Sequence, residues 1–207
     1  MNGLSLIPAE NASGNFSLTV HAIAVESDGG ARAITSDTLE IDITPGADAP
    51  TLTLSSASGD EDTAIALDIS SSLTDDSETL SVEISGIPEG AVLTADGEAV
   101  TVTDGVATLT PAQLANLTIT PPANSSDDFD LTITATSTDG SDTATTTATL
   151  PVSVTGVADA ATVATADAAG SEDTAIALNI DVTGVQGGDS ASITISDIPT
   201  GATLSAG

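Results

Sequence analysis

The sequence predicts an all-β protein, built from antiparallel β-sandwich domains that stack end to end in tandem. Apolar residues make up 40% of the 207 residues; they are mainly Val, Ile, Leu and Ala, interleaved with Thr and Ser. Val, Ile and Thr favour strands. Turn dipeptides such as Asp96-Gly97 and Asp104-Gly105 separate short apolar runs, as expected between antiparallel strands. Long stretches of the sequence also recur, which indicates several copies of one domain.

The recurrence is clearest at Gly59–Ile69 (GDEDTAIALDI), which returns as Gly170–Ile180 (GSEDTAIALNI), 111 residues later. A period of this length indicates an array of whole domains rather than a solenoid of small units. Further upstream the spacing is 113, so the first copy has two extra residues near Ile23–Asp28. Three other pairs carry the repeat: Ile84–Ala95 with Ile195–Ala206, Ile43–Pro50 with Val154–Ala161, and Leu4–Phe16 with Leu117–Phe129.

The repeat divides the chain into three parts. Residues 1–48 correspond to the C-terminal half of one copy, residues 49–159 to a complete copy, and residues 160–207 to the N-terminal half of a third. Met1 aligns with Leu114, an apolar position inside the complete copy. We therefore expect Met1 to be an internal residue and the native chain to continue in both directions.

Within the complete copy, the alternation of apolar and polar residues predicts strands, and it is clearest at Leu131, Ile133 and Ala135. Pro111–Asn116 (PAQLAN) predicts a single helical turn. The expected strands are Thr51–Leu54, Ala64–Ile69, Leu80–Ser85, Ala91–Ala95, Ala99–Val102, Val106–Leu109, Leu117–Thr120, Phe129–Ser137 and Asp142–Thr155. Many short strands in about 100 residues are typical of an antiparallel sandwich.

Nine strands that each run the length of a sandwich bring the chain in at one pole and out at the other. Successive copies then form a rod, and the acidic loop residues gather where copies meet. The loops that carry Asp75, Asp76 and Asp139 fall beside the incoming linker residue Asp48. The second group comprises Glu61, Asp62, Asp127 and Asp128, which fall beside the outgoing linker residue Asp159.

Composition excludes several classes of function. With 31 acidic residues, one basic residue and a net charge of -30, the chain repels nucleic-acid phosphates and anionic membranes. The longest apolar runs fall short of a membrane span, and without Cys there is no disulfide or thiolate site. Paired acids such as Asp127-Asp128 could imitate a glycosidase site. The chain has one His and no Trp or Tyr, so we expect no enzyme.

Clustered carboxylates without cations to pair them repel one another. Solvent and salt can screen them, and Asp is also favoured in turns for backbone reasons. Alternatively, Ca²⁺ can bind, because it takes six to eight oxygen ligands in a loose geometry. The gathering of acids at both poles favours calcium.

Four motifs carry a family resemblance: GDEDT before the second strand, LTDDSETL after it, STDG at the end of a late strand, and GADAP at the linker. Together they resemble the repeats of giant bacterial RTX adhesins, which are exported by type I secretion, and their layout is similar to Ig-like and cadherin-like repeats. The resemblance implies an extender module, stiffened by interdomain Ca²⁺, of a secreted or bacterial cell-surface adhesin that supports cell adhesion or biofilm formation. It assigns the calcium role to Asp28, Asp48, Glu61, Asp75, Asp76, Asp139, Asp159 and Glu172.

The chain departs from the cadherin pattern in two places. Its linker has only Ala-Asp-Ala, and the positions in the third copy that match Asp75 and Asp76 are Gln186 and Gly187, with Asp189 the one acid nearby. A calcium-dependent carbohydrate- or peptide-binding module is the alternative function. The spacer is favoured because the chain has no Trp or Tyr, and near-identical copies with small side chains offer few anchors for a ligand. The expected partners are neighbouring repeats, and the two half copies are complementary enough to associate head to tail between molecules.

Overall fold

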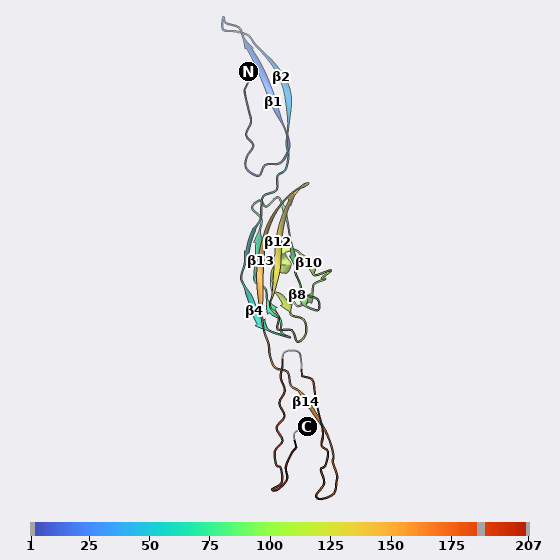
Figure 1. Ribbon diagram of the computed structural model, residues 1–207. Coiled ribbons are helices and arrows are strands. Elements are labelled where there is room, and N and C mark those ends of the chain that lie inside the picture. The colour runs from blue at the N-terminus through green and yellow to red at the C-terminus, as the bar shows by residue number, and fades with distance from the viewer. Residues whose placement is uncertain (1–2, 186–188, 206–207) are drawn as a thin grey trace.

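The computed structural model describes residues 3–185 and 189–205, and these residues form an all-β structure with several sheets (Figure 1). One 3-10 turn, η1 (Pro111–Leu114), is the only helical element among them, as the PAQLAN motif predicts. The first two strands form a hairpin, and the last two strands pair with each other near the C-terminus. The strands are β1 (Gly14–Val25), β2 (Arg32–Ile43), β3 (Thr51–Leu54), β4 (Ala57–Asp60), β5 (Ile65–Ala66), β6 (Ile69–Ser72), β7 (Thr79–Ser85), β8 (Val92–Ala95), β9 (Glu98–Ala99), β10 (Val106–Leu109), β11 (Leu117–Thr120), β12 (Phe129–Asp139), β13 (Asp142–Thr155), β14 (Thr162–Ala166) and β15 (Asn179–Thr183).

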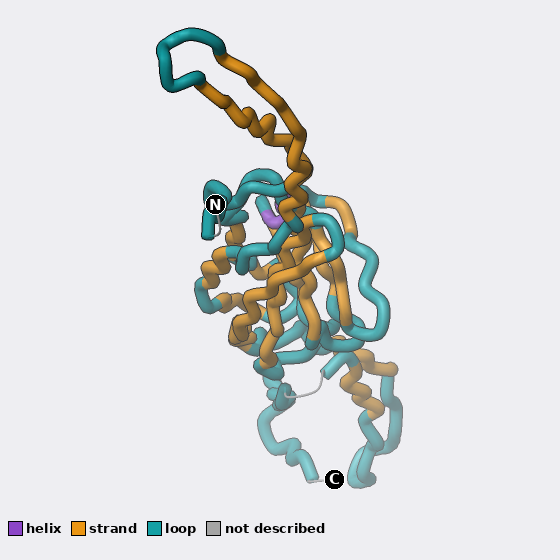
Figure 2. Tube along the Cα trace, turned by 90° about the horizontal axis from the view of Figure 1, so that it is seen from above, coloured by secondary structure: helices purple, strands orange, loops and turns teal. Residues whose placement is uncertain are grey.

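The middle of the chain forms two larger sheets, seen from another side in Figure 2. One sheet has the order β10-β7-β12-β13-β4, and the other has the order β5-β11-β8-β9. Strands β3 and β6 form a separate antiparallel pair. In Figure 1 the β1–β2 hairpin extends from one end of this central unit, and β14 lies beyond the other end.

The core lies between residues 57 and 154, and it joins side chains of both larger sheets in one cluster. On β12, Leu131 and Ile133 are fully buried, while the Thr residues between them are only partly buried. Leu93 of β8 and Ile119 of β11 are also fully buried in the same cluster. Alternation along the strands therefore places one apolar face of each sheet in the core, an arrangement consistent with a β-sandwich.

Most of the strand predictions are confirmed. Four predicted strands have the observed bounds: Thr51–Leu54, Val106–Leu109, Leu117–Thr120 and Asp142–Thr155. Three others, Leu80–Ser85, Ala91–Ala95 and Phe129–Ser137, agree with β7, β8 and β12 to within two residues at either end. The predicted strand Ala99–Val102 is observed only as the short β9, Glu98–Ala99.

The prediction of one strand at Ala64–Ile69 is wrong, because the chain changes sheets within it. Ile65 pairs with Ile119 of β11, whereas Ile69 pairs with Leu54 of β3. Leu67 and Asp68 lie between the two pairings and belong to neither strand. The alternation of inward and outward side chains continues where the chain changes sheets, so the sequence pattern alone predicts a single strand.

One edge of the five-stranded sheet departs from the predicted antiparallel pairing. Strand β4 (ASGD), which the sequence did not predict, pairs in parallel with the end of β13. Gly and Asp are depleted in strands, so this segment carries little strand signal. Gly59 is needed there because a Cβ at this position would lie 2.8 Å from Cγ1 of the buried Ile65.

The terminal parts of the chain repeat the strand pairings of the middle part. Phe16 lies opposite Ile41 in β1–β2, and their repeat counterparts Phe129 and Val152 lie opposite each other in β12–β13. The same correspondence relates β14–β15 to β3–β6. Because the two long hairpins share one register, the two extra residues of the first copy lie in the loop formed by residues 26–31.

Candidate functional site

The linker that enters the central unit is held by two acidic side chains of that unit. The backbone N–H of Asp48 donates to Glu78 Oε1 at 2.6 Å, and the N–H of Ala47 donates to Asp142 Oδ2 at 3.1 Å. Glu78 comes directly before β7, and Asp142 is the first residue of β13. Two strands of the five-stranded sheet therefore fix the position of the linker backbone.

Glu78 is a buried carboxylate, with only 5% of its surface exposed. Its second oxygen, Oε2, accepts a hydrogen bond of 2.7 Å from the hydroxyl of Ser137, which is fully buried on β12. Hydrogen bonds to a charged acceptor are shorter and stronger than neutral ones. Glu78 thus connects the linker to the centre of the sheet through both of its oxygens, and we call this arrangement the linker clamp.

Further contacts hold the rest of the incoming linker. The hydroxyl of Thr146 donates to the carbonyl of Pro50 at 2.6 Å, and the hydroxyl of Thr74 donates to the carbonyl of Ala49 at 3.1 Å. Pro45 packs so closely on the loop after β12 that a Cβ at Gly140 would lie 3.2 Å from its Cγ. The linker is consequently fixed at both of its ends.

The central hydrogen bond of the clamp recurs at the second linker. The backbone N–H of Asp159 donates to Asp189 Oδ2 at 3.0 Å. Asp159 and Asp189 lie 111 residues after Asp48 and Glu78, so they are the repeat counterparts of the same pair. The two linkers therefore share one mode of attachment, with a shorter acidic side chain at the second.

The outgoing end of the central unit uses a different acidic residue. Glu61, 9% exposed, accepts the N–H of Val157 at Oε1 over 2.7 Å, and its own N–H donates to the carbonyl of Thr155. Asp128 Oδ1 accepts the N–H of Val154 at 2.7 Å. These contacts hold the backbone at the end of β13 and in the first residues of the outgoing linker.

The structure places the predicted acidic loops at the expected ends. The loop with Asp75 and Asp76 contains Glu78, and Asp139 lies opposite Asp142 at the end of the β12–β13 hairpin, so both loops adjoin the incoming linker. Asp75 Oδ1 accepts the N–H of Ser77, and Asp76 is exposed.

The predicted calcium-binding residues of the other two copies lie at the surface. Asp28 is exposed in the loop between β1 and β2, and Glu172 is exposed before β15. Gln186 and Gly187 lie outside the described residues, as does Met1.

The acidic residues of both poles offer only oxygen ligands, and this chemistry suits Ca²⁺. Within residues 3–185 and 189–205, however, no group of three or more His, Asp or Glu side chains converges as a metal site would require. Several carboxylate oxygens of the two poles instead accept backbone N–H groups, as at Glu61, Glu78 and Asp142. These carboxylate oxygens therefore hold the backbone of the two linkers.

Sequence reasoning missed the role of Glu78, Asp142 and Asp189. Glu78 lies inside the LTDDSETL motif, Ser137 begins the STDG motif and Asp48 lies in GADAP, so the clamp joins three of the four motifs. The retained acid at positions 78 and 189 is the signal that could have identified the clamp.

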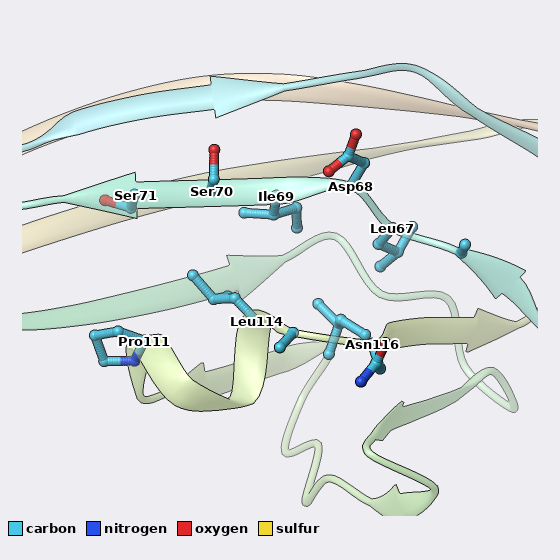
Figure 3. A pocket seen from close by; sticks show the side chains of 11 residues that line it. Leu67, Asp68, Ile69, Ser70, Ser71, Pro111, Leu114 and Asn116 are labelled. Atoms are coloured by element: carbon cyan, nitrogen blue, oxygen red, sulfur yellow. The ribbon is translucent and has the colours of Figure 1, made fainter.

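Figure 3 shows a groove where the chain crosses between sheets. Its volume is about 510 Å³. It lies between β6 and η1, its lining is mostly apolar, and Asp68 is its one charged residue. The lining residues are Ala66, Leu67, Asp68, Ile69, Ser70, Ser71, Pro111, Leu114, Ala115, Asn116 and Leu117. No residue of the linker clamp contributes to it.

Comparison with known proteins adds no further assignment. No helix in the described part of the chain is long and apolar enough to cross a membrane. The sequence matches no protein-family model, and no curated protein is significantly similar to it.

Proposed function

We propose that the chain is a structural spacer, a segment of a rod in which β-sandwich domains follow one another in tandem. In this proposal residues 49–159 form one complete domain, and residues 1–48 and 160–207 belong to the domains on either side. The observation that supports it most is the repeated clamp, in which Glu78 holds Asp48 and Asp189 holds Asp159. A contact kept at two successive linkers is expected where the orientation between domains matters.

The clamp restricts the linker through both energy and geometry. A hydrogen bond to a charged group contributes about 1.5–3 kcal/mol, and Glu78 is shielded from water. Pro45 and Pro50 flank the clamped residues, and their rings fix φ and reduce backbone freedom. A linker held in this way keeps the two domains that it joins in one relative orientation.

The family resemblance supplies the biological setting of the proposal. An extender of a secreted or bacterial cell-surface adhesin needs length, stiffness and a surface that binds little. The 14 residues of β13 span roughly 45 Å at about 3.3 Å per residue, which sets the length that each domain adds. The high negative charge keeps neighbouring molecules apart. These properties suit a stalk that supports cell adhesion or biofilm formation.

We also propose that Ca²⁺ binds at the junctions and adds to the stiffness supplied by the clamp. At the incoming pole, Asp75, Asp76 and Asp139 would hold it together with Asp48. At the outgoing pole, Glu61 and Asp159 would contribute. Asp28 and Glu172 are the counterparts of Asp139 and Glu61 in the other copies. Bound Ca²⁺ would neutralise carboxylate repulsion, which screening by salt relieves only in part.

The spacer proposal is tested by measuring how widely the angle at the first linker varies. Thr35 on β2 and Thr145 on β13 are exposed, and the chain contains no Cys, so spin labels can be placed at T35C and T145C alone. The distance distribution between the labels should be narrow in the otherwise unchanged protein, even with chelator present. Glu78→Ala should broaden it at a concentration at which the chain sediments as a monomer.

Glu83→Ala is the matched control, because Glu83 is exposed on β7, the strand that directly follows Glu78, and holds no linker residue. It should leave the distribution narrow. A distribution as broad in the unchanged protein as in Glu78→Ala would contradict the spacer proposal. Broadening on chelation alone would instead assign the stiffness to calcium.

A further inference from the structure

The segment that enters the central unit runs beside β13, the strand that leaves it, in the same direction and in nearly constant register. The N–H of Ala47 donates to Asp142, and the hydroxyl of Thr146 donates to the carbonyl of Pro50; these partners lie 95 and 96 residues apart in sequence. Farther along, β4 pairs in parallel with the end of β13, again at a spacing of 95 residues. The incoming segment therefore follows β13 over most of the length of the unit.

The same alignment continues to the outgoing linker. The N–H of Glu61 donates to the carbonyl of Thr155 at 2.9 Å, and the N–H of Val157 donates to Glu61 Oε1 at 2.7 Å. The pairing of β12 with β13 ends before the last three residues of β13, and in the described chain β4 is the one strand that pairs with those residues. Residues 47–61 and 142–157, which lie side by side, are called the parallel edge below.

Tension along the chain would act on the two sides of the parallel edge in opposite directions. The β1–β2 hairpin extends from one end of the central unit, and β14 lies beyond the other end (Figure 1). Pulling on the chain draws residues 47–61 toward the incoming linker and β13 toward the outgoing linker. Because the two segments run in the same direction, they can separate only by sliding along each other. Hydrogen bonds weaken steeply away from their preferred geometry, so sliding must break all the contacts of the edge together.

We propose that the parallel edge carries tension from one linker to the next, so that the chain is a tether that resists pulling as well as a spacer. This inference rests on the proposed spacer function, because a domain feels tension only when the chain on both sides of it is held. Tension passes from the incoming linker through residues 47–61 into β13, and from β13 directly into the outgoing linker. The sheet β5-β11-β8-β9 lies outside this path.

A second pairing holds the incoming segment against sliding. Between its contacts with β13, β3 pairs antiparallel with β6. Side chains add hydrogen bonds to this pair: Thr51 Oγ1 lies 2.6 Å from Ser72 Oγ, and Ser71 Oγ donates to the carbonyl of Thr51 at 2.7 Å. When β3 is drawn along its own axis, these bonds are also loaded together. The incoming segment is thus held on two sides over the same stretch.

The resistance of the parallel edge should depend on the direction of pulling. Ala47 and Asp142 lie together at the incoming pole. A force applied across this pole breaks their contact first, then the contact between Pro50 and Thr146, and only then the pairing of β4. Each contact would face the force alone, whereas tension between the linkers loads them all. The free energy of unfolding, in contrast, is the same for both directions.

The test pulls the full chain in two directions, with chelator present so that calcium contributes nothing. The chain has no Cys, so handles can be attached at exposed positions. Thr35→Cys with Thr165→Cys draws the linkers apart, and Thr35→Cys with Ser141→Cys pulls across the incoming pole. Optical tweezers should measure a several-fold higher unfolding force for the first pair.

The extension identifies the unit that unfolds between the first pair of handles. Residues 49–159 extend to about 3.5 Å each, and the folded unit already spans roughly 45 Å at the strand rise. Unfolding should therefore lengthen the chain by about 340 Å. The force of this step is the quantity to compare.

Thr146→Val tests one contact of the edge, because it removes the hydroxyl that holds the carbonyl of Pro50. At a fixed force between the linkers, the unfolding rate, which governs forced unfolding, should rise about three- to tenfold, as expected for the loss of one hydrogen bond. Thr147→Val is the matched control. Thr147 is the next residue of β13, and its hydroxyl bonds instead to Thr134 of β12. Its unfolding rate should stay within about twofold of the unchanged chain, since exposed substitutions usually have small effects.

A weakened core provides the second control. Ile119 of β11 is fully buried, but it lies in the sheet outside the path of tension. Ile119→Val should lower the midpoint of urea unfolding at least as much as Thr146→Val does. It should nevertheless leave the unfolding force between the linkers nearly unchanged. If Thr146 contributed only to overall stability, the two variants would lose force alike.

Equal unfolding forces in the two directions would overturn the proposal. So would a Thr146→Val chain that unfolds as slowly under force as Thr147→Val, or an Ile119→Val chain that loses as much force as Thr146→Val. The spacer proposal is tested without applied force, through the distance between spin labels. A narrow distance distribution in a chain that yields equally in both directions would keep the spacer and remove the tension-carrying edge.

Discussion

Oε1 of Glu78 accepts the backbone N–H of Asp48 at 2.6 Å, across 30 residues of sequence. The other oxygen of the same carboxylate accepts the hydroxyl of Ser137 on the central strand β12. One side chain therefore couples the position of the linker to the packing of the sheet. A change at Glu78 should affect both the stability of the unit and the freedom of the linker.

Glu78→Ala should lower the free energy of unfolding of the central unit by about 2 kcal/mol or more, because the buried Ser137 hydroxyl and the Asp48 N–H lose their acceptor at about 1–3 kcal/mol each. Urea unfolding measures this change. Glu78→Gln keeps an acceptor oxygen and should lose less. Glu83→Ala should stay within about 0.5 kcal/mol, as exposed substitutions usually do. Equal losses in Glu78→Ala and Glu83→Ala would contradict the role of the clamp.

Gly86→Ala should destabilise the central unit more than Gly97→Ala. Both glycines have positive φ, +82° and +84°, but only at Gly86 would a Cβ meet backbone, the carbonyl oxygen of Asp130 at 2.8 Å. The backbone conformation alone costs about 1–2 kcal/mol, so any excess in Gly86→Ala reports the close approach of β12. Thermal unfolding of the two variants gives the comparison. A smaller loss at Gly86 than at Gly97 would show that β12 can move aside.

Millimolar Ca²⁺ should raise the melting temperature relative to chelator at matched ionic strength, because a ligand at 100 times its dissociation constant adds about 2.7 kcal/mol to the folded state. Mg²⁺ should do less, since it requires a stricter octahedral geometry. Calorimetry measures both effects. Asp75→Asn together with Asp76→Asn should reduce the calcium response. Identical melting temperatures with calcium and with chelator would remove calcium from the proposed function.

X-ray scattering should detect the combined effect of the two linkers. At a concentration at which the chain sediments as a monomer, Glu78→Ala together with Asp189→Ala should shorten the maximum dimension and broaden the distance distribution. Chelation should act in the same direction but less strongly, because the hydrogen bonds to Asp48 and Asp159 remain. A profile that neither change alters would mean that packing of the linkers alone fixes the rod.

Much of the fold follows from the sequence because the signals are local. Alternation over a few residues marks β12, and Asp-Gly turns end the strands around β8 and β9. The repeat adds long-range information, since spacings of 113 and 111 residues relate Phe16 and Ile41 to Phe129 and Val152, which pair in the same way. The number of strands, each running the length of the sandwich, indicates that loops carrying Asp75 and Asp139 adjoin the linker at Asp48.

The sequence by itself thus determined the all-β class, the repeat and the grouping of acidic loops at the linkers. Only the tertiary structure decided the parallel pairing of β4 with β13 and the change of sheet between Ile65 and Ile69. It also decided that Glu78 is the acidic residue of the linker clamp. Each of these depends on residues far apart in the chain that meet only after folding. Glu78 resembles its neighbours Asp75 and Asp76 in sequence, and burial against Ser137 is what separates it from them.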